Sequence, residues 1–396
     1  MKSWKALLMT SLLFFSLLTA CSMSDKSEKS ISENKTITFA LLAPLTGQNA
    51  EYGKGFEVST KMAVDEINSK GGVQGYKLQI KVGDSKGEPK ESSDLCRQFI
   101  DDKTIAAIIG DFTSGASMAN APIVDEGKIV QISPTASNPD YAGMSPFTFS
   151  IMGRQDGEGP FFSTYILKKK MGAQKIGVIY VNSDWGLASY NALTGQMQKD
   201  GLDLVASAEY VTGETDFSTV VSKVQAEEPD TVVILDQGAV PYILNQIHKV
   251  GWTDVKIATL GPGSSQQLID LTGEASENLY TSTPFFFNPD NENDEAWRKT
   301  FLDKAGFEPT VHPVCAYDCV YILAKALENV PADVLASNDI GALRLAIRDA
   351  VQNIEIEGMT GPIKFNENGD ITRAYIIAQV QKGKWVMVEG YDYATK

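Results

Sequence analysis

Histidine is almost absent from this sequence, and most acid–base and metal chemistry is absent with it. Only His248 and His312 occur among 396 residues. His248 stands beside Lys249 in an amphipathic segment, and His312 shares no zinc-like spacing with a cysteine. There is also no Gly-x-Ser-x-Gly elbow and no Walker loop. We therefore expect no catalytic residue, cofactor or metal site, and we expect that the chain is not an enzyme.

Cysteine is scarce as well, which argues against a disulfide framework. One of the four cysteines, Cys21, lies near the N-terminus, and the other three form an odd set. Cys315 and Cys319 are four residues apart on a predicted helix, where a bridge is geometrically awkward. We expect three buried free thiols, and the alternative is a bridge that involves Cys96.

Positive charge is in deficit. The chain has 35 lysines and arginines against 50 aspartates and glutamates, a formal net charge of −15. An acidic surface repels phosphate backbones, so nucleic acid is not expected as a partner.

Long apolar runs are missing apart from one at the N-terminus. Residues 6–18 are almost entirely apolar and follow Lys2 and Lys5. This is the layout of a secretory signal peptide, and it is too short for a stable membrane span. Leu18-Thr19-Ala20-Cys21 resembles a bacterial lipobox, whose cysteine is acylated. Residues 1–20 are therefore predicted to be a signal peptide, with Cys21 as the lipidation site.

The next segment predicts a tether. Residues 21–35 comprise Cys21 and a stretch rich in serine and charge, which cannot bury enough apolar surface to fold. Acyl chains contribute about 0.8 kcal/mol per buried CH₂, so several of them would hold the protein on a bilayer. We expect a protein of the cell envelope, extracytoplasmic and lipid-anchored to a membrane.

The remaining sequence alternates between apolar strands and amphipathic helices. This alternation predicts parallel sheets with helices on both faces, and its length suits two domains. The fold class is α/β, with two doubly wound parallel-sheet lobes joined by a hinge that the chain crosses several times. The predicted strands are 36–43, 77–84, 105–110, 129–133, 175–181, 204–210, 231–235, 256–260 and 279–283.

The C-terminal third is predicted to complete both lobes. It offers helices at 297–305, 317–327 and 340–351, and a hairpin of 363–365 with 375–380 around Asn368-Gly369-Asp370. We expect crossings between the lobes near residues 150, 283 and 356. The first lobe is then 36–150 plus 283–355, and the second lobe is 151–282 plus 356–396.

Several motifs resemble the leucine/isoleucine/valine-binding protein family. They occur in the family's order and span nearly the whole mature chain. The resemblance implies the type I periplasmic-binding fold, a small-molecule ligand, ABC permease subunits as partners and a monomeric protein. The matching segments are GQNAEYGKGFEVSTKMAVDEINSKGGVQG (47–75), Ile109-Gly110, the region from Pro122 to Pro139 with its IVDEGKIVQISPTASNPD (123–140), 157–160, YVNSDWG (180–186), GETDF (213–217) and 364–369.

Two loops of the first lobe are candidate ligand sites. Residues 113–117 follow a strand and open a helix, whose N-terminal N–H groups suit a carboxylate. By resemblance, Ser114 donates to that carboxylate, although a plain N-cap role is the alternative. In the loop Thr135-Ala136-Ser137, the Thr135 carbonyl would accept from a ligand ammonium and Ser137 would donate to the carboxylate. The alternative there is a turn held by its own hydroxyls.

Trp185 of the second lobe and Tyr52 of the first lobe are expected to form walls of the ligand site. The resemblance also has a gap, since the family's glutamate after Gly-Pro is missing where Gly261-Pro262 is followed by Gly263. Asp236 or Asp156 could replace that acid. Without a substitute, a buried ammonium would be costly, and the ligand would then lack an amine.

The sequence therefore predicts the solute-binding lipoprotein of an ABC importer, with an amino acid of branched-chain type as the ligand. An amine-free carboxylate, an aromatic acid or a short amide is the alternative ligand. A sensor that reports to a membrane receptor is the alternative role.

Overall fold

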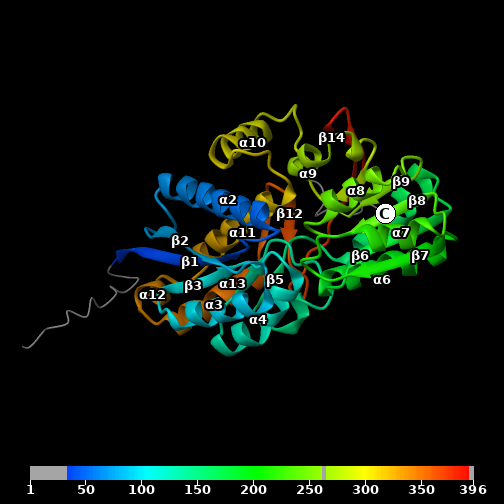
Figure 1. Ribbon diagram of the computed structural model, residues 1–396. Helices are drawn as coiled ribbons and strands as arrows, with labels where there is room; N and C mark the ends of the chain where they lie inside the picture. The colour runs from blue at the N-terminus through cyan, green and yellow to red at the C-terminus, as the bar shows by residue number, and fades with distance from the viewer. Residues whose placement is uncertain (1–33, 261–264, 392–396) are drawn as a thin grey trace, which may run out of the picture.

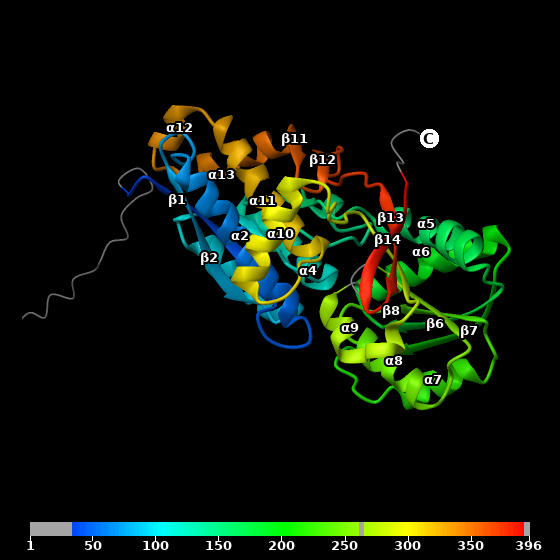
Figure 2. The same cartoon turned by 90° about the horizontal axis from the view of Figure 1, so that it is seen from above.

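The computed structural model describes residues 34–260 and 265–391. The predicted signal peptide, Cys21 and most of the predicted tether lie outside these residues, as does the Gly261–Ser264 segment. The described residues build two large sheets, each covered by helices, and one separate two-stranded sheet; Figures 1 and 2 show the large sheets with their helices as two units side by side. We name them the five-stranded unit and the seven-stranded unit.

The five-stranded unit has the strand order β2-β1-β3-β4-β5, and all of its neighbouring strands are parallel. Helices cover the sheet, and Figure 1 shows α2 above it and α3 and α4 below; the central strands β1 and β3 are accordingly almost fully buried and nearly continuous apolar runs. The strands are β1 (Thr36–Ala43), β2 (Lys77–Asp84), β3 (Ile105–Ile109), β4 (Gln131–Ser133) and β5 (Thr148–Ser150). The helices are α2 (Ala50–Ser69), α3 (Pro89–Asp101), α4 (Ser114–Gly127), η1 (Ala142–Met144), α11 (Val311–Glu328), α12 (Ala332–Ala336) and α13 (Ile340–Gln352).

The seven-stranded unit has the order β14-β13-β10-β9-β8-β6-β7. Five strands are parallel, and β13 and β14 add an antiparallel edge. The strands are β6 (Lys175–Val181), β7 (Asp203–Tyr210), β8 (Thr231–Leu235), β9 (Lys256–Thr259), β10 (Tyr280–Thr283), β13 (Tyr375–Gln381) and β14 (Lys384–Tyr391). The helices are α5 (Gln155–Phe161), η2 (Phe162–Met171), α6 (Asp184–Asp200), α7 (Ser218–Gln225), α8 (Val240–Lys249), α9 (Gln266–Thr272) and η4 (Gly273–Ser276).

The predicted α/β fold is confirmed, and the chain passes between the units three times. The passages follow β5, β10 and the short hairpin of β11 (Glu355–Gly358) with β12 (Gly361–Lys364). After β10 the chain returns through α10 (Glu292–Ala305), which packs on α2. The third passage was expected near residue 356 but lies between Ile371 and Tyr375. Ile371 still belongs to the core of the five-stranded unit, whereas Tyr375 packs in the core of the seven-stranded unit.

The predicted hairpin between 363–365 and 375–380 is wrong. β12 pairs with β11, while β13 pairs with β10 and β14. The Asn366–Asp370 turn closes on itself, because the Asn366 side-chain oxygen accepts from the amides of Asn368 and Asp370. The Gly369 carbonyl accepts a hydrogen bond from the Ser150 amide, so this turn packs against β5. After the turn, the chain continues to the other unit.

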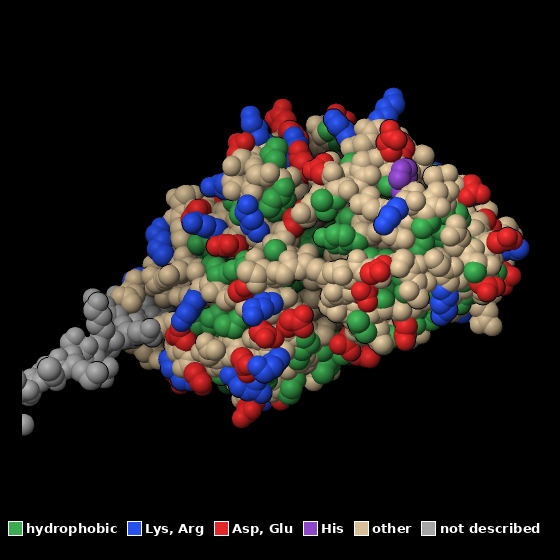
Figure 3. Space-filling model, in the orientation of Figure 1, with side chains coloured by type: hydrophobic (Ala, Val, Ile, Leu, Met, Phe, Trp, Pro, Cys, Tyr) green, Lys and Arg blue, Asp and Glu red, His purple; other side chains and the backbone are tan. Residues whose placement is uncertain are grey.

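The three cysteines of the described residues are buried and free, as predicted. Burial raises the pKa of Cys96 and of Cys315 to about 12. None of the helices in residues 34–260 and 265–391 is long and apolar enough to cross a membrane. Figure 3 shows acidic and basic side chains interspersed over the visible face rather than basic side chains gathered in one patch.

Candidate functional site

The carboxyl ends of β3 and β4 carry the first loops of the candidate site. After β3, the Thr113 hydroxyl caps α4 by accepting from the Ala116 amide at 3.3 Å. Ser114, at the first position of α4, is fully buried, and its hydroxyl accepts from the Asn138 amide at 3.3 Å. The start of α4 and the loop after β4 are thus held side by side.

The loop after β4 is organised around Ser133. Its hydroxyl donates to the Asp111 carbonyl at 2.7 Å and accepts from the Ala136 amide at 2.8 Å. The Thr135 hydroxyl donates to the Phe112 carbonyl at 2.7 Å. These hydroxyls stabilise the loop itself, and they aim Ser137 toward the other unit.

The N-terminus of α6 meets this loop from the seven-stranded unit. The Trp185 indole donates from Nε1 to the Ser137 hydroxyl at 3.2 Å, and the Asn138 side chain donates to the Asp184 carbonyl at 3.0 Å. Behind Trp185, the Gln155 side chain donates to the Trp185 carbonyl at 3.2 Å. Direct polar contacts therefore join the two units.

A cavity lies where the units meet. A volume of about 20 Å³ is open to a water-sized sphere, so the walls must separate before a ligand as large as an amino acid fits. Both units line it, and the lining mixes aromatic and apolar side chains with polar ones. The lining residues are Phe112, Thr135, Ser137, Met152, Glu158, Trp185, Gln237, Pro284, Val311, His312 and Tyr375.

Three of the predicted site residues line this cavity: Thr135, Ser137 and Trp185. Ser114 and Ala136 are buried beside it without lining it.

Tyr52 lies behind the wall of the cavity. It stacks on Phe112 with ring centroids 4.6 Å apart, and its hydroxyl donates to the Gln237 carbonyl at 3.2 Å.

Neither of the two acids proposed as replacements lines the cavity. The Asp236 carboxylate accepts from the Tyr210 hydroxyl at 2.7 Å and from the amides of Gly238 and Ala239. Burial raises the pKa of Asp236, and these hydrogen bonds act in the opposite direction. Asp156 is exposed and forms a two-pronged ion pair with Arg154.

Glu158 is the acid that the sequence analysis missed. It is 7% exposed, lines the cavity, and its Oε1 accepts from the Ser282 hydroxyl of β10 at 2.6 Å. Helical spacing could have identified it, since positions three and four apart share a face. Gln155, Glu158 and Gly159 are buried, whereas Asp156 points to solvent.

His312 is the second missed residue. Burial lowers its pKa to about 3, so the ring is neutral at physiological pH. Its Nδ1 lies 2.9 Å from the Thr310 hydroxyl, which also accepts from the His312 amide. No pattern in the sequence indicated that His312 is buried at the start of α11.

The sequence matches the family described as periplasmic binding protein over residues 36–384. The Leu/Ile/Val-binding protein homolog 1 of Brucella abortus is 28% identical over 347 residues, which cover 86% of this chain and 89% of that protein. The Leu/Ile/Val-binding protein of Escherichia coli is 24% identical over 358 residues, which cover 90% of this chain and 93% of that protein.

Solved structures share the fold. A leucine-binding protein from Thermotoga maritima superposes with a TM-score of 0.80 at 22% identity, covering 91% of this chain and all of that one. A solute-binding protein from R. palustris in complex with benzoate also gives a TM-score of 0.80, at 18% identity, covering 90% and 96%. These two neighbours thus differ in ligand: the first is a leucine-binding protein, and the second is in complex with benzoate.

Proposed function

Because the chain belongs to the periplasmic binding protein family, we propose that it captures a small solute for an ABC importer at the extracytoplasmic face of a membrane. The solute is an amino acid, held between the five-stranded and seven-stranded units. Permease subunits in the membrane receive it. The protein works as a monomer, and the family's members are binding proteins rather than enzymes.

The observation that carries this proposal is the cavity whose lining comes from both units. Phe112 and Ser137 belong to one unit, and Glu158, Trp185 and Tyr375 belong to the other. A ligand that touches both walls stabilises only the arrangement in which they meet. Its binding energy therefore shifts the equilibrium between open and closed forms.

The chemistry of the lining favours a ligand with a carboxylate. Ser137 offers a hydroxyl, and the N-terminus of α4 lies directly behind it. Ligand binds first to the loops of the five-stranded unit. The seven-stranded unit then closes, and Trp185 excludes water from the polar contacts.

The anchor belongs to the same proposal. Lipidation at Cys21, after removal of residues 1–20, would keep the protein next to the permease. Residues 22–35 would act as a tether that lets the folded part of the protein stand clear of the membrane. Mass spectrometry of the membrane-bound protein tests this step. Acyl chains on an N-terminal Cys21 are expected, and an unmodified chain that starts elsewhere would contradict it.

Thermal unfolding tests the binding function. A soluble form that starts at Ser22 is unfolded and refolded to remove carried ligand, then screened with amino acids, benzoates, short aliphatic acids and amides. A ligand at 100 times its Kd adds about 2.7 kcal/mol, which raises Tm by a few degrees. A rise with one amino-acid class supports the proposal, and no rise with any compound overturns it.

The aromatic acids are the second candidate, because the lining contains Phe112, Trp185 and Tyr375. A rise with benzoates alone would select them. Loss of solute uptake after deletion of the gene would distinguish an importer component from a sensor.

A further inference from the structure

We propose that Glu51 and Asp270 couple closure of the two units to the uptake of a proton, so that the closed form is favoured at acidic pH. Glu51 lies in the first turn of α2 in the five-stranded unit, and Asp270 lies in α9 of the seven-stranded unit. The two acids thus belong to units that must separate before a ligand enters. This inference goes beyond the proposed function, but it rests on the open and closed forms that the function requires.

Both acids line one cavity between the units. Its volume is about 740 Å³, and its walls combine the start of α2 with α9 and with the residues that follow α10. Glu51 also lines a second cavity of about 200 Å³, together with Tyr242 of α8 and Leu271 of α9. Figure 2 shows α9 across from the N-terminal end of α2. Glu51 therefore stands in the contact between the units, where it is partly buried.

The charged groups around Glu51 do not neutralise it. The only base in the lining of the larger cavity is Lys54, whose Nζ lies 5.7 Å from the centre of the Phe307 ring. Within residues 34–260 and 265–391, no base forms an ion pair with Glu51. The smaller cavity adds Tyr52 and Tyr242 but no further charged side chain. The charged residues that line the larger cavity are Glu51, Lys54 and Glu57 of α2, Asp270 of α9, and Glu308 after α10.

Closure changes the surroundings of Glu51, and the direction of the effect follows. In the closed arrangement, burial and the charge of Asp270 raise the pKa of Glu51 from 4.5 to about 7. Separation of the units exposes Glu51 to water and moves it away from Asp270, so its pKa returns toward the ordinary value. Between pH 4.5 and pH 7 the closed form therefore binds more protons than the open form. The equilibrium constant for closure falls as the pH rises through this window.

The polar contacts that join the units elsewhere do not depend on pH in this way. The Trp185 indole donates to the Ser137 hydroxyl, and the Asn138 side chain donates to the backbone carbonyl of Asp184. None of these groups gains or loses a proton near neutral pH. A ligand that contacts both units is consequently held more tightly in acidic surroundings and released more readily at alkaline pH.

A cross-link between the units measures closure without any ligand. An added Cβ at Gly115 of α4 would lie 2.7 Å from Asp184 Oδ2 and 3.8 Å from Asp184 Cγ. Gly115→Cys combined with Asp184→Cys thus brings two sulfur atoms near bonding distance when the units are closed. In the soluble form that starts at Ser22, the three native cysteines are buried and do not compete for oxidised glutathione. The rate of cross-linking then reports the fraction of closed protein.

This rate is measured at pH 5 and at pH 8 in two proteins that both carry the cysteine pair. One keeps Glu51, and the other has Glu51→Gln. Dividing the first rate by the second removes the pH dependence of the thiol chemistry, which the two proteins share. From pH 5 to pH 8 the ratio should fall by about 10- to 100-fold, as the raised pKa of one carboxyl group requires.

Two further variants separate the causes. Glu57→Gln removes an exposed acid that lines the same cavity, and it should follow the protein with Glu51 at both pH values. Asp270→Asn removes the facing charge but leaves Glu51 partly buried, so it should reduce the fall without abolishing it. Asp270→Asn also provides the test if Glu51→Gln does not fold.

A ratio that is the same at pH 5 and at pH 8 would overturn the inference. It would also be overturned if Glu57→Gln changed the rates as much as Glu51→Gln does. Because the cross-link needs no ligand, either result leaves the proposed capture of a solute standing. Conversely, a screen in which no compound binds would refute the proposed function without deciding the outcome of the cross-linking.

Discussion

The Trp185 indole and the Ser137 hydroxyl form a hydrogen bond of 3.2 Å that joins α6 of the seven-stranded unit to the loop after β4 of the other. Trp185 is 2% exposed and Ser137 is 5% exposed. Both residues line the cavity, so this bond forms part of the wall that closes over a ligand.

Trp185→Phe should weaken ligand binding by favouring the open form. The substitution keeps most of the ring packing but removes the Nε1 donor, which contributes about 0.5–1.5 kcal/mol. Affinity is expected to fall by up to about tenfold. Calorimetry on Trp185→Phe, Ser137→Ala and the double variant measures the coupling between the two residues. Fully additive effects would mean that the bond contributes nothing to closure.

Gly186→Ala should destabilise the protein by at least about 2 kcal/mol. An added Cβ would lie 1.9 Å from the Val181 carbonyl oxygen, so the start of α6 would have to move, and Trp185 with it. Gly195 on the same helix is the control, because nothing lies within 4 Å of its added Cβ. Gly195→Ala should be neutral or stabilising by up to about 1 kcal/mol. Equal denaturant midpoints for the two variants would contradict the packing argument.

Glu51 should make stability fall as the pH rises. Burial and the nearby Asp270 raise the pKa of Glu51 from 4.5 to about 7. Between these values the folded state binds more protons than the unfolded state, so the free energy of unfolding decreases with pH in this window. Glu51→Gln should remove that decrease and stabilise the protein by roughly 1–2 kcal/mol at pH 8.

Urea unfolding at pH 5 and at pH 8 measures this effect. Glu57→Gln, which alters an exposed acid on the same helix, is the control and should follow the natural protein. If the free energy of unfolding of Glu51→Gln differs between pH 5 and pH 8 by as much as that of the natural protein, Glu51 does not have this role.

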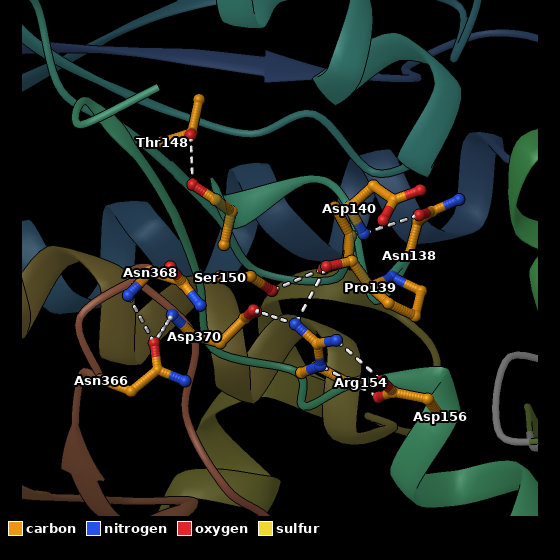
Figure 4. Close-up of polar contacts among 12 residues, drawn as sticks. Asn138, Pro139, Asp140, Thr148, Ser150, Arg154, Asp156, Asn366, Asn368 and Asp370 are labelled. Atoms are coloured by element: carbon orange, nitrogen blue, oxygen red, sulfur yellow. Dashed lines mark hydrogen bonds and ion pairs between the residues drawn. The ribbon is translucent and has the colours of Figure 1, made fainter. Parts of the chain in front are cut away.

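Arg154→Gln should cost about 2–4 kcal/mol of stability. The Arg154 guanidinium donates to the Asp370 carboxylate at 3.0 Å and to the Pro139 carbonyl at 2.9 Å, as Figure 4 shows. The Asp370 side chain is 3% exposed, so removing its partner leaves a buried charge. Asp156→Asn breaks only the exposed arm of the same network and should cost under about 1 kcal/mol. Similar thermal midpoints for both variants would contradict this division.

Local patterns account for most of the fold. All eight residues from Thr36 to Ala43 form β1 as predicted, and β2, β6 and β8 also have the predicted bounds. Apolar or alternating runs between turn residues specify strands without reference to the rest of the chain. The site loops were predictable for the same reason, because they follow those strands.

The pairing of the C-terminal strands was not predictable in this way. Asn368-Gly369-Asp370 has hairpin composition, yet its hydrogen bonds go to Asn366 and to Ser150 of β5. The true hairpin turns at Lys382 and Gly383, both with positive φ. Turn composition identifies where a chain reverses, but the partner of a strand depends on segments far away in the sequence.

The sequence by itself determined the α/β architecture, the alternation of strands and helices, and the loops that carry Thr135, Ser137 and Trp185. These features follow from local periodicity and from the ends of strands. Only the tertiary structure decided which acid faces the cavity. Asp236, Asp156 and Glu158 are all acidic, so the residue type alone does not show which of them faces the cavity. Packing between α5, α6 and β10 buries Glu158 at the cavity, whereas Asp236 accepts local hydrogen bonds and Asp156 turns to solvent.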